Sequence, residues 1–476
     1  MQMWINGKFE ASQSSEVFEV RNPATGAIID TAPLGGEEDV EVAIEAAAEA
    51  SKEWAATAPQ ARAKLLFRAC ELVQERLEGL ARLLTSEQGK PLSEAKNELL
   101  GFSKVLEYYC GLASTLKGDF IKIPGNGYSF TLKHPLGNCA ALIPWNMPAL
   151  IMGWKLGPAL ISGNCLLLKP ASSTPLTNLS LAALLGEAGL PPGVLNVISG
   201  PGPLVGEAIA KHPAIKKLSF TGDTETGKRV AALSAPSMKR LTLELGGSDP
   251  MLVCADAELE AAIEGALRGR FYNCGQTCTA VKRLYLQEEI ADEFLIKLQK
   301  RVESLKVGNG LSEGVELGPL NSEKQRTSVL TLLKEVWDNE EGKLLCGGKI
   351  PKGEEYACGN FLEPTLITDV APDSRLLSEE VFGPVLPIVR FRKLEDAIED
   401  VNRTKYGLGA SIWTKNLDQA RTASEGLEAG TVWVNQHLKV TPELPFGGTK
   451  ASGIGKENGA EALLEYLESK SVMIKV

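Results

Sequence analysis

Histidine is scarce in this chain of 476 residues, which contains only three. The nine cysteines include no Cys-X-X-Cys pair, so the spacing typical of zinc sites is missing and no metal centre is expected. A disulfide framework is also unexpected in a chain of this length without an export signal. We expect roughly eight of the nine thiols to be small buried hydrophobic groups.

Runs of lysine and arginine are also missing, and the formal net charge is −10. Affinity for nucleic acid depends on clustered basic side chains, so nucleic acid is not expected as a partner. The first ten residues, MQMWINGKFE, contain no basic segment followed by an apolar one, which argues against a secretory signal. The best candidate for a membrane span, 139–168, is interrupted by Pro144, Lys155 and Pro158. We expect a cytoplasmic protein that does not enter a membrane.

Hydrophobic residues make up 44% of the chain and charged residues 23%, a balance typical of globular proteins. The length predicts roughly two or three domains. After N-terminal strands (3–5, 17–20) and helices (37–54, 59–87, 93–116), the pattern changes near residue 136. Short apolar runs then alternate with helical stretches, which is the pattern of parallel sheets covered by helices.

The expected strands of the first alternating series are 140–143, 166–168, 194–198 and 217–220. A second series starts near residue 241, with strands 251–253, 282–286, 362–367, 385–390 and 431–435 and helices from 259, over 290–305 and over 322–337. The chain ends in a strand-like segment, 471–476, that has no neighbouring strand of its own and is expected to complete another sheet. The sequence therefore predicts two α/β domains in succession.

Cys278 is the cysteine whose position best suits chemistry. It follows Gly275-Gln276-Thr277 in a predicted loop between a helix and a strand, and loops on a rigid α/β scaffold often carry reactive groups. Its competitor, Cys274, is expected to lie on the helix. A Cys–His pair would need His437 beside Cys278, and this possibility stays open.

Glu244 lies between two leucines at the predicted end of a strand, followed by two glycines. A glutamate in such a setting is partly removed from water, which raises its pKa toward the range of a general base. The alternative is a glutamate on an edge strand that faces water. The glycines favour a site, because they allow close approach of the backbone.

Signals for a dinucleotide are individually weak. Gly200, Gly202 and Gly206 follow a predicted strand, but prolines interrupt the usual glycine pattern. The segment 220–224 ends another strand and opens a helix, and such helix N-termini are where dinucleotide phosphates bind. Lys169 ends a short apolar strand, where it could hold ribose hydroxyls or a phosphate.

Together these segments resemble the aldehyde dehydrogenase superfamily from about residue 17 to the C-terminus. The motifs that match, in the order and spacing of the family, are IPWNMP (143–148), GWKLGPAL with GN (153–164), LKP (168–170), GLPPGVLNVISGPG (189–202), FTGDTETG (220–227), LELGG (243–247), NCGQTC (273–278), EEVFGPV (379–385) and PFGGTKASGIGKENG (445–459).

The resemblance implies an α/β fold with a Rossmann-type cofactor domain, a second α/β catalytic domain and a small β oligomerisation arm. The implied ranges are 1–116 and 136–245 for the cofactor domain, 246–440 for the catalytic domain, and 117–135 with 460–476 for the arm, while 441–459 returns to the cofactor-domain side. A homodimer or homotetramer is expected.

The resemblance also implies the reaction, oxidation of an aldehyde to a carboxylic acid with NAD or NADP. Cys278 would form a thiohemiacetal and then a thioester, and the Asn146 side chain with the Cys278 N–H would form the oxyanion hole. Glu244 would activate the water that hydrolyses the thioester, and Glu457 would relay protons outward. The implied cofactor-binding residues are Ile143, Pro144, Trp145, Lys169, Ser172, Gly202, Gly206, Phe220, Thr221, Gly222, Asp223, Leu245, Glu380 and Phe382.

Two departures from the family pattern concern the cofactor. Ser172 stands where members that prefer NAD commonly have a glutamate, whose carboxylate repels a 2′-phosphate; we therefore predict that NADP is accepted. Asp223 stands where a serine is usual near the diphosphate, and we expect it to act as a helix N-cap instead.

The class of substrate is predicted from the positions that would line the substrate pocket. The pocket positions implied by the resemblance are Tyr109, Met147, Trp154, Thr277, Thr279, His437 and Phe446. Most are apolar or aromatic, which favours an uncharged aliphatic or aromatic aldehyde over a semialdehyde, although Lys439 could meet an anionic substrate.

Three different functions compete with aldehyde oxidation to a free acid: that of a CoA-acylating relative, that of a non-catalytic relative, and that of an unrelated Cys–His amidohydrolase. Glu244 counts against the first, because acylating members usually lack it. The retained nucleophile and cofactor residues count against the second. The third requires contact between His437 and Cys278.

Overall fold

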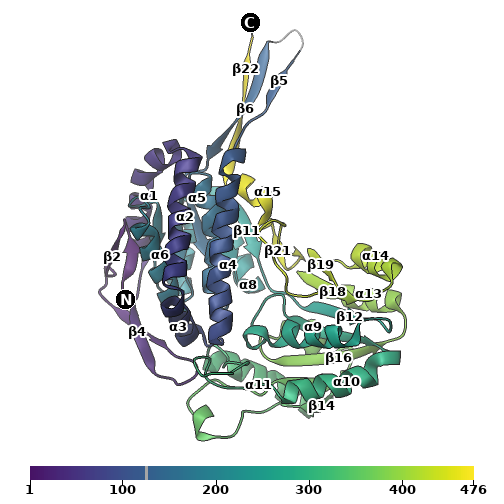
Figure 1. Cartoon of the computed structure of the whole chain (residues 1–476). Coiled ribbons are helices and arrows are strands. Elements are labelled where there is room, and N and C mark those ends of the chain that lie inside the picture. The colour runs from purple at the N-terminus through teal and green to yellow at the C-terminus, as the bar shows by residue number, and fades with distance from the viewer. Residues whose placement is uncertain (124–126, 476) are drawn as a thin grey trace.

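The computed structural model describes residues 1–123 and 127–475. Figure 1 shows two lobes, each built on a sheet with helices packed against it, and a narrow three-stranded arm that projects from the body and carries the C-terminal end of the chain. The predicted α/β class is confirmed.

The first lobe contains an eight-stranded sheet. Its strands are β1 (Met3–Ile5), β2 (Lys8–Glu10), β7 (Asn138–Leu142), β8 (Cys165–Lys169), β9 (Leu195–Val197), β10 (Lys217–Thr221), β11 (Arg240–Glu244) and β21 (Gly453–Ile454). They lie in the order β2-β1-β9-β8-β7-β10-β11-β21, and the five central strands, β9 to β11, are parallel. From β7 the chain adds β8 and β9 on one side and then β10 and β11 on the other, so the strand order reverses between β7 and β10.

Helices cover both faces of this sheet because its strands are apolar on both sides. The helices of this lobe are α1 (Glu37–Ala56), α2 (Pro59–Glu75), α3 (Leu77–Gln88), α4 (Leu92–Gly111), α5 (Pro148–Ile161), α6 (Leu176–Glu187), α7 (Glu207–Lys211), α8 (Thr224–Ser234) and α15 (Gly459–Leu464). In β7, Ala140 and Leu142 join one buried cluster with α1, α7 and α8, while Cys139 and Ala141 join another with α2, α4, α5 and α6. This alternation is the period of two that a strand imposes.

The second lobe contains a seven-stranded sheet. Its strands are β12 (Asp249–Val253), β13 (Val281–Gln287), β14 (Lys343–Cys346), β15 (Thr365–Thr368), β16 (Val385–Phe391), β18 (Gly409–Trp413) and β19 (Thr431–Val434). Their order is β14-β15-β16-β13-β12-β18-β19, parallel except for β14. The helices of this lobe are α9 (Leu259–Phe271), α10 (Glu288–Glu303), α11 (Glu323–Asp338), α12 (Arg375–Ser378), α13 (Leu394–Asn402) and α14 (Leu417–Gly426).

The arm is a three-stranded antiparallel sheet of β5 (Phe120–Lys122), β6 (Tyr128–Pro135) and β22 (Leu467–Ile474). The order is β22-β6-β5, so the C-terminal strand does pair with a strand from a distant part of the chain. The predicted arm also includes residues 124–126 and Val476, which lie outside the described residues. Two short pairs complete the fold: β3 (Val17–Arg21) with β4 (Ile28–Pro33), and β17 (Tyr406–Gly407) with β20 (Thr449–Lys450).

Several predicted boundaries were wrong. The helix predicted over 59–87 is two helices, because Arg76 leaves the helical region (φ −109°, ψ 15°). The helix predicted over 93–116 ends at Gly111 and continues as a 3-10 turn, Leu112–Thr115, which apolar periodicity does not distinguish from an α-helix. The strand predicted from residue 362 begins at Thr365, after Pro364, which has no N–H to donate.

The second series of strands also differs from the prediction. It begins at β12, because the strand at 240–244 belongs to the first sheet. The strand β18, which pairs with both β12 and β19, was missed, since a five-residue run that starts with Gly409 and Ala410 has little strand propensity. Across the described ranges, no helix is long and apolar enough to cross a membrane.

Candidate active site

Cys278 lies between the 3-10 turn Tyr272–Gly275 and strand β13, where the two lobes meet. It is half-buried, and it packs against the apolar core of the first lobe although it belongs to the second. Burial raises the pKa of its thiol to about 12, and the nearby Lys282 ammonium opposes this rise. A thiol in this state reacts only when a base accepts its proton.

The prediction for the other cysteines was only partly right. Cys346 is half-buried and Cys358, in the loop before β15, is exposed. Exposure alone would therefore have singled out Cys358, and what distinguishes Cys278 is its surroundings. The remaining six are buried, namely Cys70, Cys110, Cys139, Cys165, Cys254 and Cys274.

The turn before Cys278 is tightly constrained. Asn273, Cys274 and Gly275 have φ values of 51°, 57° and 71°, a run of left-handed residues that follows the end of α9 at Phe271. The expectation that Cys274 lies on the helix was therefore wrong, because α9 ends at Phe271. A Cβ at Gly275 would lie 2.3 Å from the carbonyl oxygen of Gly383, so only glycine fits there.

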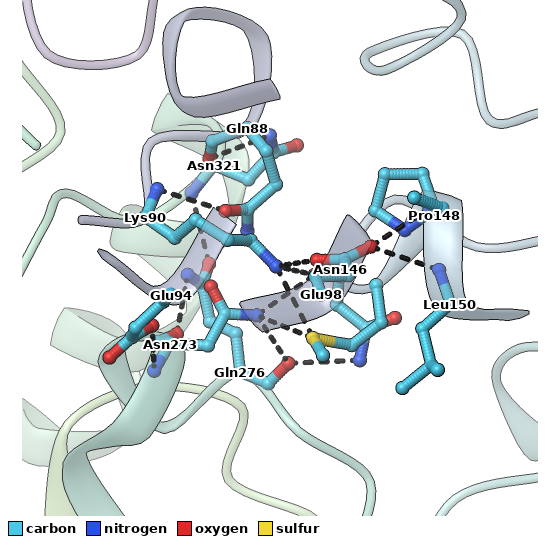
Figure 2. A network of polar contacts seen from close by, with 12 residues as sticks. Gln88, Lys90, Glu94, Glu98, Asn146, Pro148, Leu150, Asn273, Gln276 and Asn321 are labelled. Atoms are coloured by element: carbon cyan, nitrogen blue, oxygen red, sulfur yellow. Dashed lines mark hydrogen bonds and ion pairs between the residues drawn. The ribbon is translucent and has the colours of Figure 1, made fainter. Parts of the chain in front are cut away.

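Asn146 follows β7 and precedes α5, and its side chain reaches the Cys278 loop. Its Nδ2 donates a hydrogen bond of 2.9 Å to the carbonyl oxygen of Gln276. Its own carbonyl oxygen accepts from Nδ2 of Asn273 at 2.9 Å and from Nζ of Lys90 at 2.8 Å, as Figure 2 shows. An amide nitrogen has two donors, so one N–H of Asn146 remains for a ligand.

Glu244 is the last residue of β11 and is 3% exposed. The alternative of an edge-strand glutamate facing water was wrong, because β11 lies between β10 and β21. Among the described residues, neither carboxylate oxygen has a hydrogen-bond partner. Burial and the carboxylate of Glu457 raise the pKa of Glu244 well above its ordinary value, while Lys155 and Lys456 lower it.

A buried ion pair lies next to Glu244. Lys155 Nζ is 2.7 Å from Oε1 of Glu457 and donates to Ser219 Oγ at 2.8 Å, and Ser219 also donates to Glu457. The sequence pointed to Glu457 but not to Lys155 and Ser219. The signal for Lys155 was present: it is the only charged residue in α5, a helix whose residues are otherwise apolar or glycine.

The predicted cofactor residues of the first lobe gather at one edge of its sheet. Open α/β sheets bind ligands where the strand order reverses, and in this sheet it reverses between β7 and β10. The residues follow the carboxyl ends of the parallel strands: Ile143, Pro144 and Trp145 after β7, Lys169 and Ser172 at and after β8, Gly202 and Gly206 after β9, Phe220, Thr221, Gly222 and Asp223 at the end of β10, and Leu245 after β11.

Individual cofactor candidates have distinct surroundings. Lys169 is buried, its Nζ donates to the carbonyl oxygen of Pro170 at 3.0 Å, and burial lowers its pKa to about 8. Ser172 Oγ donates to the carbonyl oxygen of Gly200 at 2.8 Å. Asp223 accepts from the backbone N–H of Thr226 at 2.9 Å, so the predicted N-cap of α8 is confirmed.

The second lobe contributes Glu380 and Phe382 from the loop before β16. Oε1 of Glu380 accepts from the backbone N–H of Gly247 at 3.1 Å and lies 3.3 Å from Nζ of Lys282. The Phe382 ring meets the Trp145 ring of the first lobe edge to face, with centroids 5.5 Å apart. Contacts from both lobes therefore converge beside the sheet edge.

Lys282 is a further residue that the sequence did not single out. It is fully buried on β13 and donates to the carbonyl oxygens of Thr277 at 2.9 Å and of Cys278 at 2.5 Å. Together with its ion pair to Glu380, these bonds connect the cysteine loop to a predicted cofactor-binding residue. The available signal was a pair of basic residues, Lys282 and Arg283, in a strand that is otherwise mostly apolar and starts three residues after the cysteine.

Four of the seven predicted substrate residues, Tyr109, Met147, Trp154 and Phe446, belong to or pack against the apolar core that Cys278 also contacts. Trp154 and Phe446 are buried with ring centroids 5.1 Å apart, and Met147 and Cys278 pack against the same core. Tyr109 is buried, with its hydroxyl donating to the carbonyl oxygen of Gly459 at 3.3 Å. Thr277 and Thr279 flank the cysteine and are also buried.

His437 does not pair with the Cys278 thiol. Its Nε2 is 2.8 Å from the carbonyl oxygen of Thr279, and its Nδ1 is 2.8 Å from Oγ of Ser411. Burial lowers its pKa to about 4, so it is neutral and serves as a hydrogen-bonded support of the loop. This arrangement argues against the Cys–His amidohydrolase. The described residues hold no cluster of His, Cys, Asp and Glu suited to a metal ion.

Comparison with known proteins agrees with this geometry. The sequence profile of the aldehyde dehydrogenase family matches residues 9–472. The chain is 42% identical to retinaldehyde dehydrogenase 3 of Homo sapiens over 100% of this chain and 93% of that protein, and 42% identical to phenylacetaldehyde dehydrogenase of Pseudomonas fluorescens over 99% and 95%.

Solved structures give the same result. The fold superimposes on the NAD+ complex of aldehyde dehydrogenase from Bacillus cereus with a TM-score of 0.97 at 38% identity, covering 100% of this chain and 96% of that one. An E. coli NADP dependent enzyme matches equally well, with a TM-score of 0.97, 38% identity and coverage of 100% and 98%. The chain belongs to the aldehyde dehydrogenase family.

Proposed function

We propose that this protein oxidises an aldehyde to a carboxylic acid with NAD or NADP, through a thioester on Cys278. The observation that carries the proposal is the convergence of three groups at the junction of the lobes. The half-buried thiol of Cys278 lies close enough to the unpartnered buried carboxylate of Glu244 for the two to interact electrostatically, and the Asn146 amide, with one free N–H, reaches the loop that carries the cysteine.

The first step is attack of the Cys278 sulfur on the aldehyde carbon, which forms a C–S bond and places negative charge on the former carbonyl oxygen. Asn146 Nδ2–H and the backbone N–H of Cys278 stabilise that charge. Because burial raises the pKa of the thiol, its proton has to be accepted as the bond forms, and Glu244 is the carboxylate available.

Hydrolysis of the thioester needs a base for water. Glu244 first passes on the proton taken from Cys278, and Glu457, held by Lys155 and Ser219, takes part in that transfer. Glu244 then accepts a proton from water, hydroxide adds to the acyl carbon, and the C–S bond breaks to release the acid. Glu244 returns the proton of the water to the sulfur, which restores the thiol. The raised pKa of Glu244 suits this role, because a stronger base removes the proton more readily.

The residues at the sheet edge fit a dinucleotide. Lys169 donates to one acceptor among the described residues and has further donors for ribose hydroxyls. Glu380 offers acceptor oxygens for the second ribose, and the Phe382 and Trp145 rings lie in contact beside it. When bound, the dinucleotide supplies the nicotinamide that takes a hydride from the substrate carbon. The Bacillus cereus relative is described as an NAD+ complex and the E. coli relative as NADP dependent.

We propose that NADP is accepted as well as NAD. Ser172 contributes a hydroxyl and no negative charge beside Lys169, so the repulsion that a carboxylate would exert on a 2′-phosphate is missing. Its hydrogen bond to the carbonyl oxygen of Gly200 fixes the serine just after the carboxyl end of β8.

The substrate that we propose is an uncharged aliphatic or aromatic aldehyde. Trp154, Phe446 and Tyr109 belong to the apolar core that Cys278 packs against, and no charged side chain belongs to the substrate set predicted from the sequence. One relative at 42% identity is named for phenylacetaldehyde, an aromatic aldehyde. Lys439 is exposed, which makes it less suited to meeting an anionic substrate next to the half-buried cysteine.

The assembly that we propose is a homodimer or homotetramer formed through the arm. Apolar side chains on its strands are exposed, with Phe120 65%, Ile121 52% and Met473 75% accessible, and both outer strands have unpaired edges within the described residues. A second copy would cover them. The domain ranges and the cytoplasmic location stay predictions from the sequence.

The decisive experiment follows NAD(P)H absorbance with a panel of aldehydes, with and without coenzyme A, for the wild type and Cys278→Ala. We expect turnover without coenzyme A in the wild type and none in the variant. Turnover that survives the alanine substitution would refute the mechanism, and a requirement for coenzyme A would indicate an acylating enzyme.

A further inference from the structure

Lys90 is a fully buried lysine that the proposed reaction does not use. It lies in the short connection between α3 and α4, and Figure 2 shows it at the centre of a polar network. Its Nζ forms an ion pair with Oε2 of Glu98 and donates to the carbonyl oxygen of Asn146 at 2.8 Å and to Sδ of Met147 at 3.2 Å. An ammonium group has three donors, and each of them has a partner here.

Glu98, the partner of Lys90, contacts the chain a few residues after Asn146. Its Oε1 accepts from the backbone N–H groups of Ala149 at 2.8 Å and of Leu150 at 3.3 Å, in the first turn of α5. The pair therefore binds the backbone on both sides of the start of α5, at Asn146 before it and at Ala149 and Leu150 after it.

A second group of contacts reaches Asn146 from the cysteine loop. Nδ2 of Asn273 donates to the carbonyl oxygen of Asn146 that Lys90 also contacts, and the backbone N–H of Asn273 donates to Oε2 of Glu94 at 2.9 Å. The Asn146 side chain donates back to Gln276. Residues of the α3–α4 region thus hold both the amide donor and the loop that carries Cys278.

A buried ion pair is an unusual means of holding a helix start, because removing two charges from water costs more than an apolar contact of the same size. The chain itself offers the comparison: Glu87 accepts from the backbone N–H groups of Leu176 and Thr177 at the start of α6 and forms no ion pair among the described residues. At the start of α5 the ammonium group of Lys90 is added to the carboxylate. It donates a hydrogen bond to the carbonyl oxygen of Asn146, which a carboxylate that only caps a helix does not provide.

We propose that the Lys90–Glu98 pair is a positioning device for the oxyanion hole. It fixes the peptide of Asn146, so that the free Nδ2–H points at the place where the aldehyde oxygen gains charge. Lys90 and Glu98 do not touch the reacting atoms; they act through Asn146. The inference rests on the proposed role of Asn146 in the oxyanion hole. A double-mutant cycle tests the role of Asn146 and the positioning role of the Lys90–Glu98 pair separately.

This cycle uses the full-length enzyme with NADP or NAD and one aldehyde. Lys90→Met and Glu98→Gln are each made alone and with Asn146→Ala, and Glu87→Gln is the matched control. For Lys90→Met and Glu98→Gln we expect kcat to fall by roughly 10- to 100-fold, with KM for both substrates within about threefold of wild type. With Asn146→Ala present, the further loss should be under about threefold, because coupled residues do not add.

The outcomes are distinguishable. Should Asn146→Ala leave kcat unchanged, the oxyanion role of Asn146 is wrong. If it lowers kcat but the Lys90 and Glu98 losses simply add to it, only the positioning role is wrong. The control Glu87→Gln is expected to lose thermal stability without losing kcat per folded enzyme. The same result for Lys90→Met and Glu98→Gln would overturn the positioning role. Glu98→Gln keeps an acceptor for the helix start, so the cycle can be completed with this variant if Lys90→Met does not fold.

Discussion

A Cβ atom at Gly447 would lie 2.3 Å from Oε1 of Glu244, so the absence of a side chain at one residue makes room for the carboxylate of the other. Gly447 belongs to the segment that returns from the second lobe to the first sheet. The position of the proposed base thus depends on a residue some two hundred positions away in the chain.

We predict that Gly447→Ala displaces Glu244 and lowers kcat by about 100-fold or more, the usual contribution of a positioned base. Gly447 also has a φ of +155°, so alanine there strains the backbone. Gly137→Ala is the matched control, since Gly137 has a φ of +104° but no atom within 4 Å of an added Cβ. Steady-state kinetics and thermal unfolding compare the two. Similar losses of kcat in both variants would contradict the prediction.

The pH dependence of hydrolysis should respond in opposite directions to two substitutions next to Glu244. A base acts when deprotonated, so the rate rises with pH through its pKa. The Glu457 carboxylate raises that pKa and the Lys456 ammonium lowers it. Glu457→Gln should therefore move the rise of kcat to lower pH, and Lys456→Met should move it to higher pH. Profiles of kcat against pH check this, and shifts in the same direction would exclude Glu244 as the titrating group.

Cofactor choice should change at Ser172. In Ser172→Glu the added carboxylate repels the 2′-phosphate, and kcat/KM for NADP should fall by roughly 10- to 100-fold while the value for NAD is kept. Ser172→Ala is the control, because it removes the hydrogen bond to Gly200 without adding charge. The wild type is expected to use NADP; a preference of about a hundredfold for NAD would refute the interpretation of Ser172.

Lys282 should affect the reactivity of the nucleophile. Its ammonium opposes the raised pKa of the Cys278 thiol, so Lys282→Met should move the alkylation of Cys278 by iodoacetamide to higher pH. Peptide mass spectrometry measures this residue by residue. The exposed Cys358 is an internal reference whose labelling should not change. An unaltered pH dependence at Cys278 would show that Lys282 only holds the loop.

Local patterns in the sequence carried much of the prediction. The alternation of apolar runs and helical stretches indicated parallel sheets, since strands buried on both faces must be apolar throughout. Cys278, Glu244 and Lys169 were each recognisable because a chemically active group follows a strand or lies in a loop. The N-cap role of Asp223 also followed from local geometry alone.

The sequence by itself thus determined the fold class, the family resemblance and the residues to suspect. Only the tertiary structure revealed what lies around them, because the partners come from distant parts of the chain. Lys155 and Ser219 meet Glu457, Lys282 meets Glu380, and Lys90 meets Asn146 across sequence separations that no local pattern encodes. Burial of a charge is decided by packing, and packing exists only once distant parts of the chain have folded against each other.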